Sequence, residues 1–248
     1  MAKTTPTYTP VIKALGEGMK SAIYFDLDNT LTDRNASIDE FAKCFIRHFS
    51  NELSVTNVKK VSQIIRDQDN GGYLDKCSPY QKIYQAVSCE LHKQLQWNNN
   101  VNVEIIEQFW REEFPNCTVE MKGASRLINE LHLQGYHLGI ISNGSDASRQ
   151  KTVASTTLGH LFKQVVSSEK FGVSKPNCSI FIETAKVAGF KTSQCLYVGD
   201  HPVNDISGAK NAGMGVIWLQ GFHTDSGLPN GVIKVKNLDE IEPLLSNF

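Results

Sequence analysis

The chain has 248 residues, a formal net charge of −1, 40% hydrophobic residues and 21% charged residues. This length is enough for one large domain or two smaller ones with a hydrophobic core. The near-zero net charge excludes a global basic field that would attract a nucleic-acid polymer or an acidic membrane surface, although a local basic pocket is compatible with it.

Three features bear on where the protein works. The sequence contains no run of about 18 apolar residues, so we expect no membrane span. The polar, threonine-rich segment 1–19 has no apolar stretch of the signal-peptide kind, and we expect a loose N-terminal extension there. The six cysteines are scattered without a CxxC pair, which predicts reduced thiols in a cytoplasmic protein.

The expected elements begin with one buried strand over 21–26. Apolar residues then recur at helical spacing from Thr32 to about Thr118, interrupted at Gly71-Gly72 and Ser78-Pro79. After about Met121, helices and strands alternate. The expected strands are 136–142, 164–168, 195–199 and 216–219, the expected helices are 124–133, 147–157, 177–188 and 204–212, and the segments 233–235 and 238–245 close the chain.

These strands are apolar throughout, which is typical of a parallel sheet covered on both faces. The sequence therefore predicts an α/β fold, with a Rossmann-like parallel sheet core formed by 20–33 and 119–248. An all-helical domain, 34–118, is inserted after the first strand.

Polar side chains gather where the expected strands end, which is where open parallel sheets bind their ligands. The clusters are DLDNT at 26–30, SNG at 142–144, Lys175-Pro176 in the loop after strand 164–168, and GD at 199–200 followed by Asp205. Burying Asp26 and Asp28 together is costly unless a cation or a proton compensates them. Carboxylates, a lysine and neutral donors together fit Mg²⁺ and a phosphate group.

The segments DLDNT (26–30), SN (142–143), SKP with Lys175, and GDHPVND (199–205) occur in an order and spacing that resemble the haloacid dehalogenase-like (HAD) superfamily. The similarity spans the whole α/β core and is greatest to the phosphatase branch of nucleotidases and sugar phosphatases. That branch carries a helical C1-type cap at the place where this chain has its helical insertion.

The resemblance implies a role for each matching residue. Asp26 is the expected nucleophile, which forms an aspartyl-phosphate, and Asp28 the expected general acid and base. Mg²⁺ is expected on Asp26, the backbone carbonyl of Asp28, and Asp200. The expected phosphate donors are Ser142, Asn143 and Lys175, Asp205 is expected to position a metal-bound water or pair with Lys175, and Thr30 is expected to donate to a neighbouring carboxylate or turn.

Each assignment has a plainer alternative. The two acids could form a solvated turn, Asp205 could simply suit a helix N-terminus, Ser142-Asn143 could be turn chemistry, and Lys175 could be a surface lysine. For other residues the plainer interpretation is the expectation. We expect His201 to face solvent, Arg149 and Gln150 to lie on a solvated helix face, Phe109 and Trp110 to pack between helices, and Arg34, Arg111 and Lys122 to make at most cap or hinge contacts.

The leading hypothesis is a Mg²⁺-dependent phosphatase acting on a small phosphorylated metabolite, a nucleotide or a sugar phosphate. A phosphomutase of the same superfamily shares the catalytic set and stays open. A 2-haloacid dehalogenase needs neither Mg²⁺ nor a second acid, so Asp28 and Asp200 argue against it. A non-catalytic phosphate-binding regulator could have lost Asp26, Asp28 or Lys175, and none is lost.

Overall fold

The computed structural model describes residues 21–54 and 57–245, so the expected N-terminal extension, 1–19, lies outside the described residues. The chain forms two compact units. Of the described residues, the first unit contains 21–31, 121–149 and 157–245, and the second contains 32–54, 57–120 and 150–156.

The first unit is built on one parallel sheet of six strands in the order β3-β2-β1-β4-β5-β6. The strands are β1 (Ala22–Phe25), β2 (His137–Ser142), β3 (Gln164–Ser167), β4 (Cys195–Gly199), β5 (Gly215–Leu219) and β6 (Ile233–Val235). Phe25 at the end of β1 lies opposite Ile140 on one side and Val198 on the other. This register brings the residues that follow β1, β2 and β4 to one edge of the sheet, as the sequence predicts.

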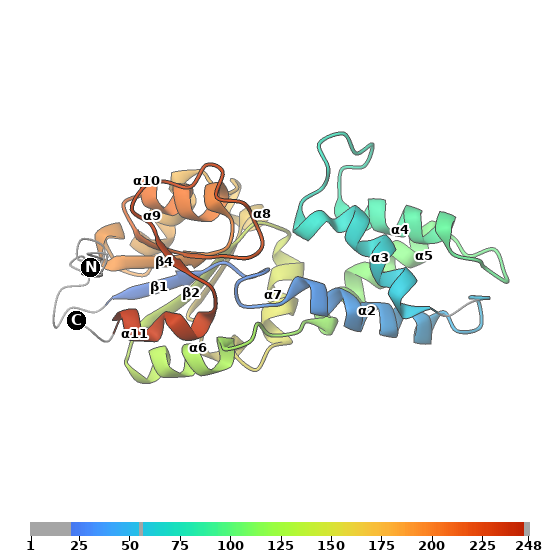
Figure 1. Ribbon diagram of the computed structural model, residues 1–248, viewed down its shortest axis with the longest axis horizontal. Coiled ribbons are helices and arrows are strands. Elements are labelled where there is room, and N and C mark those ends of the chain that lie inside the picture. Colours follow the sequence, from blue (N-terminus) through green and yellow to red (C-terminus); the bar gives the residue numbers. More distant parts are fainter. Residues whose placement is uncertain (1–20, 55–56, 246–248) are drawn as a thin grey trace, which may run out of the picture. The chain divides into compact units, whose positions relative to one another are not determined.

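Helices cover both faces of this sheet, with α9 and α10 on one and α6 and α11 on the other (Figure 1). The helices that contribute to the unit are α6 (Ala124–Leu133), α7 (Asp146–Ala154), α8 (Ser168–Phe171), α9 (Cys178–Val187), α10 (Gly208–Asn211) and α11 (Glu242–Leu245). Phe181 of α9 packs edge-on against Tyr197 of β4, with ring centroids 5.1 Å apart. The predicted α/β class and parallel sheet are confirmed.

One predicted helix differs in form. The segment 204–212 is expected to be a single α-helix, but it begins with a π-helical turn, η5 (Pro202–Ser207), and only Gly208–Asn211 is α-helical. The wide turn arises because the carbonyl of His201 accepts hydrogen bonds from the backbone N–H groups of both Asp205 and Ile206. It sets the position of Asp205 relative to the end of β4.

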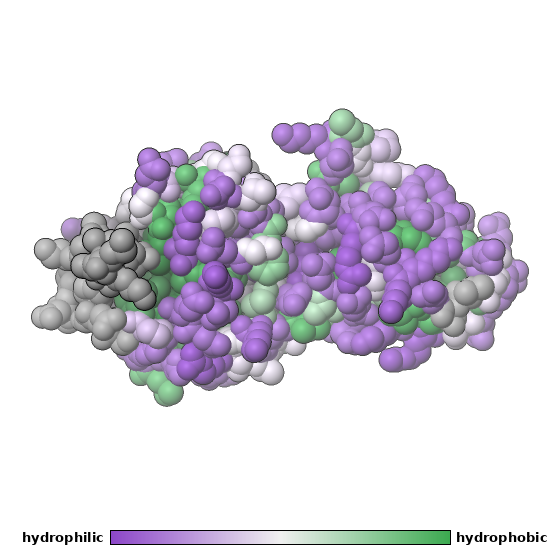
Figure 2. Space-filling model, viewed as in Figure 1, coloured by the Kyte–Doolittle hydropathy of each residue, from purple (hydrophilic) through white to green (hydrophobic). Residues whose placement is uncertain are grey.

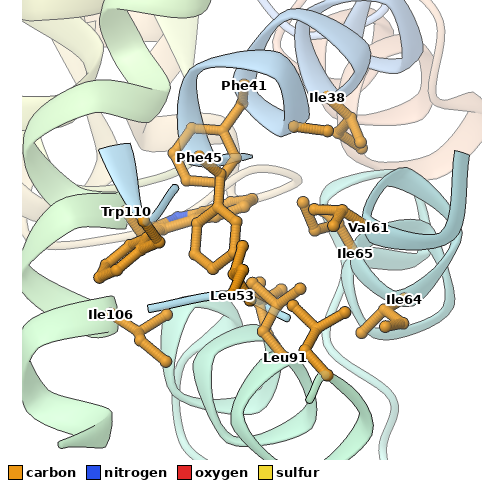
Figure 3. Close-up of a cluster of buried hydrophobic side chains, with 14 of the residues drawn as sticks. Ile38, Phe41, Phe45, Leu53, Val61, Ile64, Ile65, Leu91, Ile106 and Trp110 are labelled. Carbon is orange, nitrogen blue, oxygen red and sulfur yellow. The ribbon is translucent and has the colours of Figure 1, made fainter. Parts of the chain in front are cut away.

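The second unit is helical. Its helices are α2 (Arg34–His48), α3 (Val58–Asp69), α4 (Ile83–Gln94) and α5 (Val103–Glu113), with short turns η1 (Asn70–Gly72) and η2 (Phe114–Cys117). Apolar side chains from all four helices meet in its interior (Figure 3). Trp110 packs edge-on against Phe41, with centroids 4.7 Å apart, so it has the packing role that the sequence predicts.

The surface of the helical unit that Figure 2 shows is mostly hydrophilic, as expected for helices whose apolar stripes face one shared core. Arg34 and Asp69 are exceptions, because both charged residues are buried inside this unit. Nε and Nη2 of Arg34 donate to the two carboxylate oxygens of Asp69, at 2.8 and 2.6 Å. This pair ties the end of α3 to the start of α2, and Asp69 also accepts from the backbone N–H of Gly72 in the turn that follows α3. Among the described residues, no helix is long and apolar enough to cross a membrane.

The cysteines give a simple test of the packing. All six are free; Cys117 and Cys195 are buried and Cys77 is exposed. Burial raises the pKa of the Cys117 and Cys195 thiols to about 12.

At pH 8 we expect iodoacetamide to modify Cys77 first and to reach Cys117 and Cys195 only after unfolding, because the thiolate is the reactive form. Peptide mass spectrometry of native and urea-unfolded protein measures this. Rapid modification of Cys195 in the native protein would contradict the packing of β4, and a Cys77→Ser variant identifies the fast site.

Candidate active site

The centre of the site is the turn that follows β1. The backbone N–H of Asp26 donates to the carbonyl of Val198 on β4, which continues the sheet by one residue. The chain then reverses through Asn29, which has a left-handed φ of 58°, a conformation that asparagine tolerates better than most residues. This turn gives Asn29 a structural role that the sequence does not reveal.

Two different cations balance the two acids of this turn. Nζ of Lys175 lies 2.6 Å from Oδ1 of Asp26, and Nη1 of Arg149 lies 2.5 Å from Oδ2 of Asp28. The expectation that Arg149 lies on a solvated helix face is wrong, because its residue exposure is only 9%. Helical periodicity places Arg149 on α7 but cannot show that this part of α7 faces the turn after β1.

Lys175 is the most densely bonded residue of the site. It is buried, and its ammonium donates to Asp26 (2.6 Å), Asp205 (2.6 Å) and the hydroxyl of Tyr197 (2.9 Å). An ammonium has three donors, so these acceptors use all of them. Burial by itself would lower the pKa of Lys175, but the carboxylates of Asp205 and Asp26 outweigh burial and raise it. Lys175 therefore stays charged, and it is not a surface lysine.

Tyr197 is a member of the site that the sequence analysis does not identify. Its hydroxyl donates to the carbonyl of Ile141 on β2, at 2.8 Å, and accepts from Lys175. Burial raises the pKa of Tyr197 well above its ordinary value, so the hydroxyl stays protonated. The sequence does contain one indication of this role: Tyr197 lies in the apolar strand CLYVG, and a buried phenol needs a hydrogen-bond partner.

Asp205 lies against the end of β4. Its Oδ1 accepts from Lys175 at 2.6 Å, and its Oδ2 accepts from the backbone N–H of His201 at 2.9 Å. Gly199 makes room for it, because a Cβ at this position would lie 2.6 Å from atoms of the Asp205 side chain. Of the two expected roles for Asp205, the geometry shows the pairing with Lys175.

Two histidines stand beside this cluster. The expectation that His201 faces solvent is wrong: it is half-buried, and its Nδ1 accepts from the backbone N–H groups of Val203 and Asn204 at the start of η5. His223 follows β5, and its Nε2 lies 3.3 Å from Oδ2 of Asp200. The contact with Asp200 raises the pKa of His223. The sequence does not predict this contact of His223 with Asp200, because a single histidine in a polar loop belongs to no recognisable motif.

Asn143 holds the loop that carries Lys175. Its Oδ1 accepts from the backbone N–H of Lys175 at 2.9 Å, and its Nδ2 donates to the carbonyl of the same residue at 3.1 Å. The side chain thus fixes the lysine backbone next to the end of β2, where Ser142 is buried. The structure brings Ser142, Asn143 and Lys175 together, and their contacts with phosphate stay a prediction.

Thr30 differs from expectation. Its Oγ1 is buried and forms no hydrogen bond with any described residue, so it does not donate to a neighbouring carboxylate or turn. The two carboxylates of the turn face Lys175 and Arg149 instead. An unsatisfied buried hydroxyl costs about 1–3 kcal/mol.

The carboxylates of Asp26, Asp200 and Asp205 are suited to a divalent cation. They are all buried, and each offers an oxygen within 4.8 Å of the others. Lys175 supplies one positive charge inside this cluster, which does not balance three ionised carboxylates. Burial raises the pKa of Asp26 and Asp200, as expected for acids whose charge is incompletely compensated. Buried carboxylate oxygens are the donors that Mg²⁺ prefers, so the residues fit this ion.

The fold and this cluster define a Rossmann-like α/β protein with a buried aspartate–lysine centre at the carboxyl ends of β1 and β4. Comparison with known proteins identifies the family to which this protein belongs. The family model for haloacid dehalogenase-like hydrolases matches residues 23–219, and the chain belongs to this family. The resemblance stated from the motifs is thereby confirmed.

Curated relatives and solved structures agree with this membership. The chain is 28% identical to the glyceraldehyde 3-phosphate phosphatase of Pyrococcus abyssi over 82% of each chain. It is 36% identical to the pyrimidine 5'-nucleotidase YjjG of Escherichia coli, over 60% of this chain and 68% of the relative. The magnesium-bound HAD-hydrolase YfnB of Bacillus subtilis superimposes with a TM-score of 0.67 at 21% identity, covering 92% of this chain and 100% of the other. At that identity the superposition shows the fold alone.

Proposed function

We propose that this hydrolase is a Mg²⁺-dependent phosphatase that cleaves a small phosphorylated metabolite through an aspartyl-phosphate on Asp26. The observation that carries the proposal is the contact of Asp26 with Lys175, at 2.6 Å, inside the carboxylate cluster completed by Asp200 and Asp205. A nucleophilic carboxylate needs compensation of charge before it can approach an anionic phosphate, and this arrangement supplies it.

Asp26 is placed to act as the nucleophile. Its Oδ1 is held by Lys175, while its backbone is locked into the sheet through Val198. The carboxylate is therefore fixed in direction, which favours in-line attack on phosphorus. Ser142 and Asn143 would bind the oxygens of the phosphate from the adjacent strand ends, and Lys175 would reach a phosphate oxygen by exchanging one of its three present acceptors.

Asp28 completes the chemistry. As a carboxylic acid it would protonate the leaving alcohol, and as a carboxylate it would take a proton from the water that hydrolyses the aspartyl-phosphate. Asp26, Asp200 and the backbone carbonyl of Asp28 would hold Mg²⁺, with Asp205 bonded to Lys175 beside them. The bound ion would supply charge neutralisation at the phosphate and the attacking carboxylate.

Named relatives support a phosphorylated metabolite as substrate, because they are a glyceraldehyde 3-phosphate phosphatase and a pyrimidine 5'-nucleotidase. We further propose that the helical unit, expected over 34–118, is the cap that selects the substrate. The free cysteines are consistent with a cytoplasmic location.

Metal removal tests the proposal. We expect hydrolysis of p-nitrophenyl phosphate to fall at least ~100-fold in EDTA and to return on addition of excess Mg²⁺, because the excess negative charge of the cluster then repels the phosphate. Ca²⁺ is a matched control: it prefers more ligands at longer distances than Mg²⁺ and should restore little activity. Mg²⁺ should also raise the melting temperature by binding the folded state. Activity that is insensitive to EDTA would overturn the metal dependence, and no hydrolysis of any phosphate ester would overturn the phosphatase assignment.

A further inference from the structure

Arg149 has no role in the chemistry described above, yet it contacts one of the two proposed catalytic acids. Its Nη1 lies 2.5 Å from Oδ2 of Asp28, and the two side chains are 10% and 24% exposed. The residues are 121 positions apart in the sequence, so only the fold brings them together. A pair this close and this shielded from water restricts the orientation of both side chains.

The first turn of α7 is anchored firmly, so Arg149 has a fixed starting point. The backbone N–H of Asp146 donates to Glu169 at 2.8 Å, and the hydroxyl of Ser167 donates to the carboxylate of Asp146 at 2.8 Å. The backbone N–H of Arg149 donates to the carbonyl of Ser145 at 3.0 Å. The two bonds of Asp146 tie the start of α7 to the end of β3 and the start of α8, and residues 146–149 belong to the same compact unit as Asp28.

Gly144 provides the space for the guanidinium. It has a φ of 141°, and a Cβ at this position would lie 3.0 Å from Nε of Arg149. Nε is buried and forms no hydrogen bond with any described residue. Burying a guanidinium with one donor unsatisfied costs stability, and a buried ion pair is in general weak evidence for a stabilising role. The arrangement is therefore better explained by what it does to Asp28.

We propose that Arg149 is a positioning residue that orients the carboxyl group of Asp28 for proton transfer, an inference that rests on the proposed function. Because Nη1 contacts Oδ2, the guanidinium fixes the direction of the Asp28 carboxyl group. As the Asp26–phosphorus bond forms and the ester bond breaks, Asp28 gives its proton to the leaving oxygen. As water then attacks phosphorus and the Asp26–phosphorus bond breaks, Asp28 takes a proton from that water. Arg149 itself forms no bond to substrate.

Leaving groups of different basicity test this role. Phenol holds its proton to about pH 10, as the tyrosine side chain does, and needs protonation on departure, whereas the more acidic p-nitrophenol needs it less. We expect Arg149→Ala to lower kcat for phenyl phosphate about tenfold more than kcat for p-nitrophenyl phosphate. Lys151→Ala is the matched control, because it removes a positive charge from an exposed position on the same helix. Equal losses on both esters would overturn the proposal.

A double-mutant cycle separates positioning from a general structural effect. In an Asp28→Asn background, Arg149→Ala should change the remaining kcat less than twofold, because residues that act through one another are not additive. A full additional loss in that background would show that Arg149 acts elsewhere and would overturn the inference.

A second cycle does not depend on activity. Arg149→Ala should lower the melting temperature by about 3 °C when Asp28 is present and by less than about 1 °C in the Asp28→Asn background, since a lost partner leaves a charge unpaired. Absence of this coupling overturns the ion pair and hence the inference, while leaving the proposed function intact. If the melting temperatures show this coupling but the wild-type protein hydrolyses neither ester, the ion pair exists, and both the proposed function and the catalytic role of the pair are overturned.

Discussion

Replacing Asp26 by Asn is expected to lower the hydrolysis of p-nitrophenyl phosphate by at least ~10⁴-fold, equivalent to about 5.5 kcal/mol of transition-state stabilisation. An amide has neither the charge nor the lone-pair availability to attack phosphorus, so the covalent route is lost. The shape of the side chain is kept, and its oxygen can still accept from Lys175. The loss should therefore appear in kcat while the circular dichroism spectrum stays native.

A matched control and a direct readout accompany this variant. Asp67→Asn makes the same chemical change on the exposed face of α3, where Asp67 accepts only a surface hydrogen bond from Gln63 among the contacts observed, and it should keep full activity. Acid-quenched wild-type protein should yield a phosphorylated peptide containing Asp26, and the Asp26→Asn protein should not. Activity within tenfold of wild type in Asp26→Asn would remove Asp26 as the nucleophile.

Replacing Lys175 by Met is expected to affect both activity and stability. Methionine has a similar length but no charge, so Asp26 and Asp205 lose the cation that contacts both at 2.6 Å. Breaking a buried ion pair from one side typically costs about 3–5 kcal/mol, and we expect this loss in urea unfolding measured in EDTA. Hydrolysis should fall ~10²–10³-fold, as for the loss of one electrostatic contact to the reacting groups.

Lys186→Met is the matched control, because the Lys186 side chain is 73% exposed and its partner Glu183 is also exposed. It should change the free energy of unfolding by less than about 0.5 kcal/mol and leave hydrolysis unchanged. If Lys175→Met does not fold, Lys175→Arg keeps the charge, but its planar fork cannot match the three acceptors that an ammonium reaches, and low activity is still expected. Wild-type activity in either Lys175 variant would contradict the site.

The site also corrects the electrostatic interpretation of the sequence. In the sequence alone, the neighbouring acids Asp26 and Asp28 suggest that one cation compensates both of them, and Mg²⁺ is the cation expected. The structure assigns a side-chain cation to each acid, Lys175 to Asp26 and Arg149 to Asp28. The need for a further cation comes instead from Asp200 and Asp205, which crowd the same buried cluster as Asp26. Only the packing of β1 against β4 makes this visible.

The sequence by itself determined the parallel sheet, the helical insertion and the position of the acids at strand ends. These features follow from local patterns, because apolar runs predict buried strands and the carboxyl ends of parallel strands share one edge. The tertiary structure alone decided which side chains meet there. Tyr197, His223 and Arg149 enter the site through contacts between distant segments, and Thr30 loses its expected partner because the carboxylates beside it face other groups. Residue spacing places a side chain on an element, but its partners depend on the rotation and packing of that element in the folded chain, which no local pattern encodes.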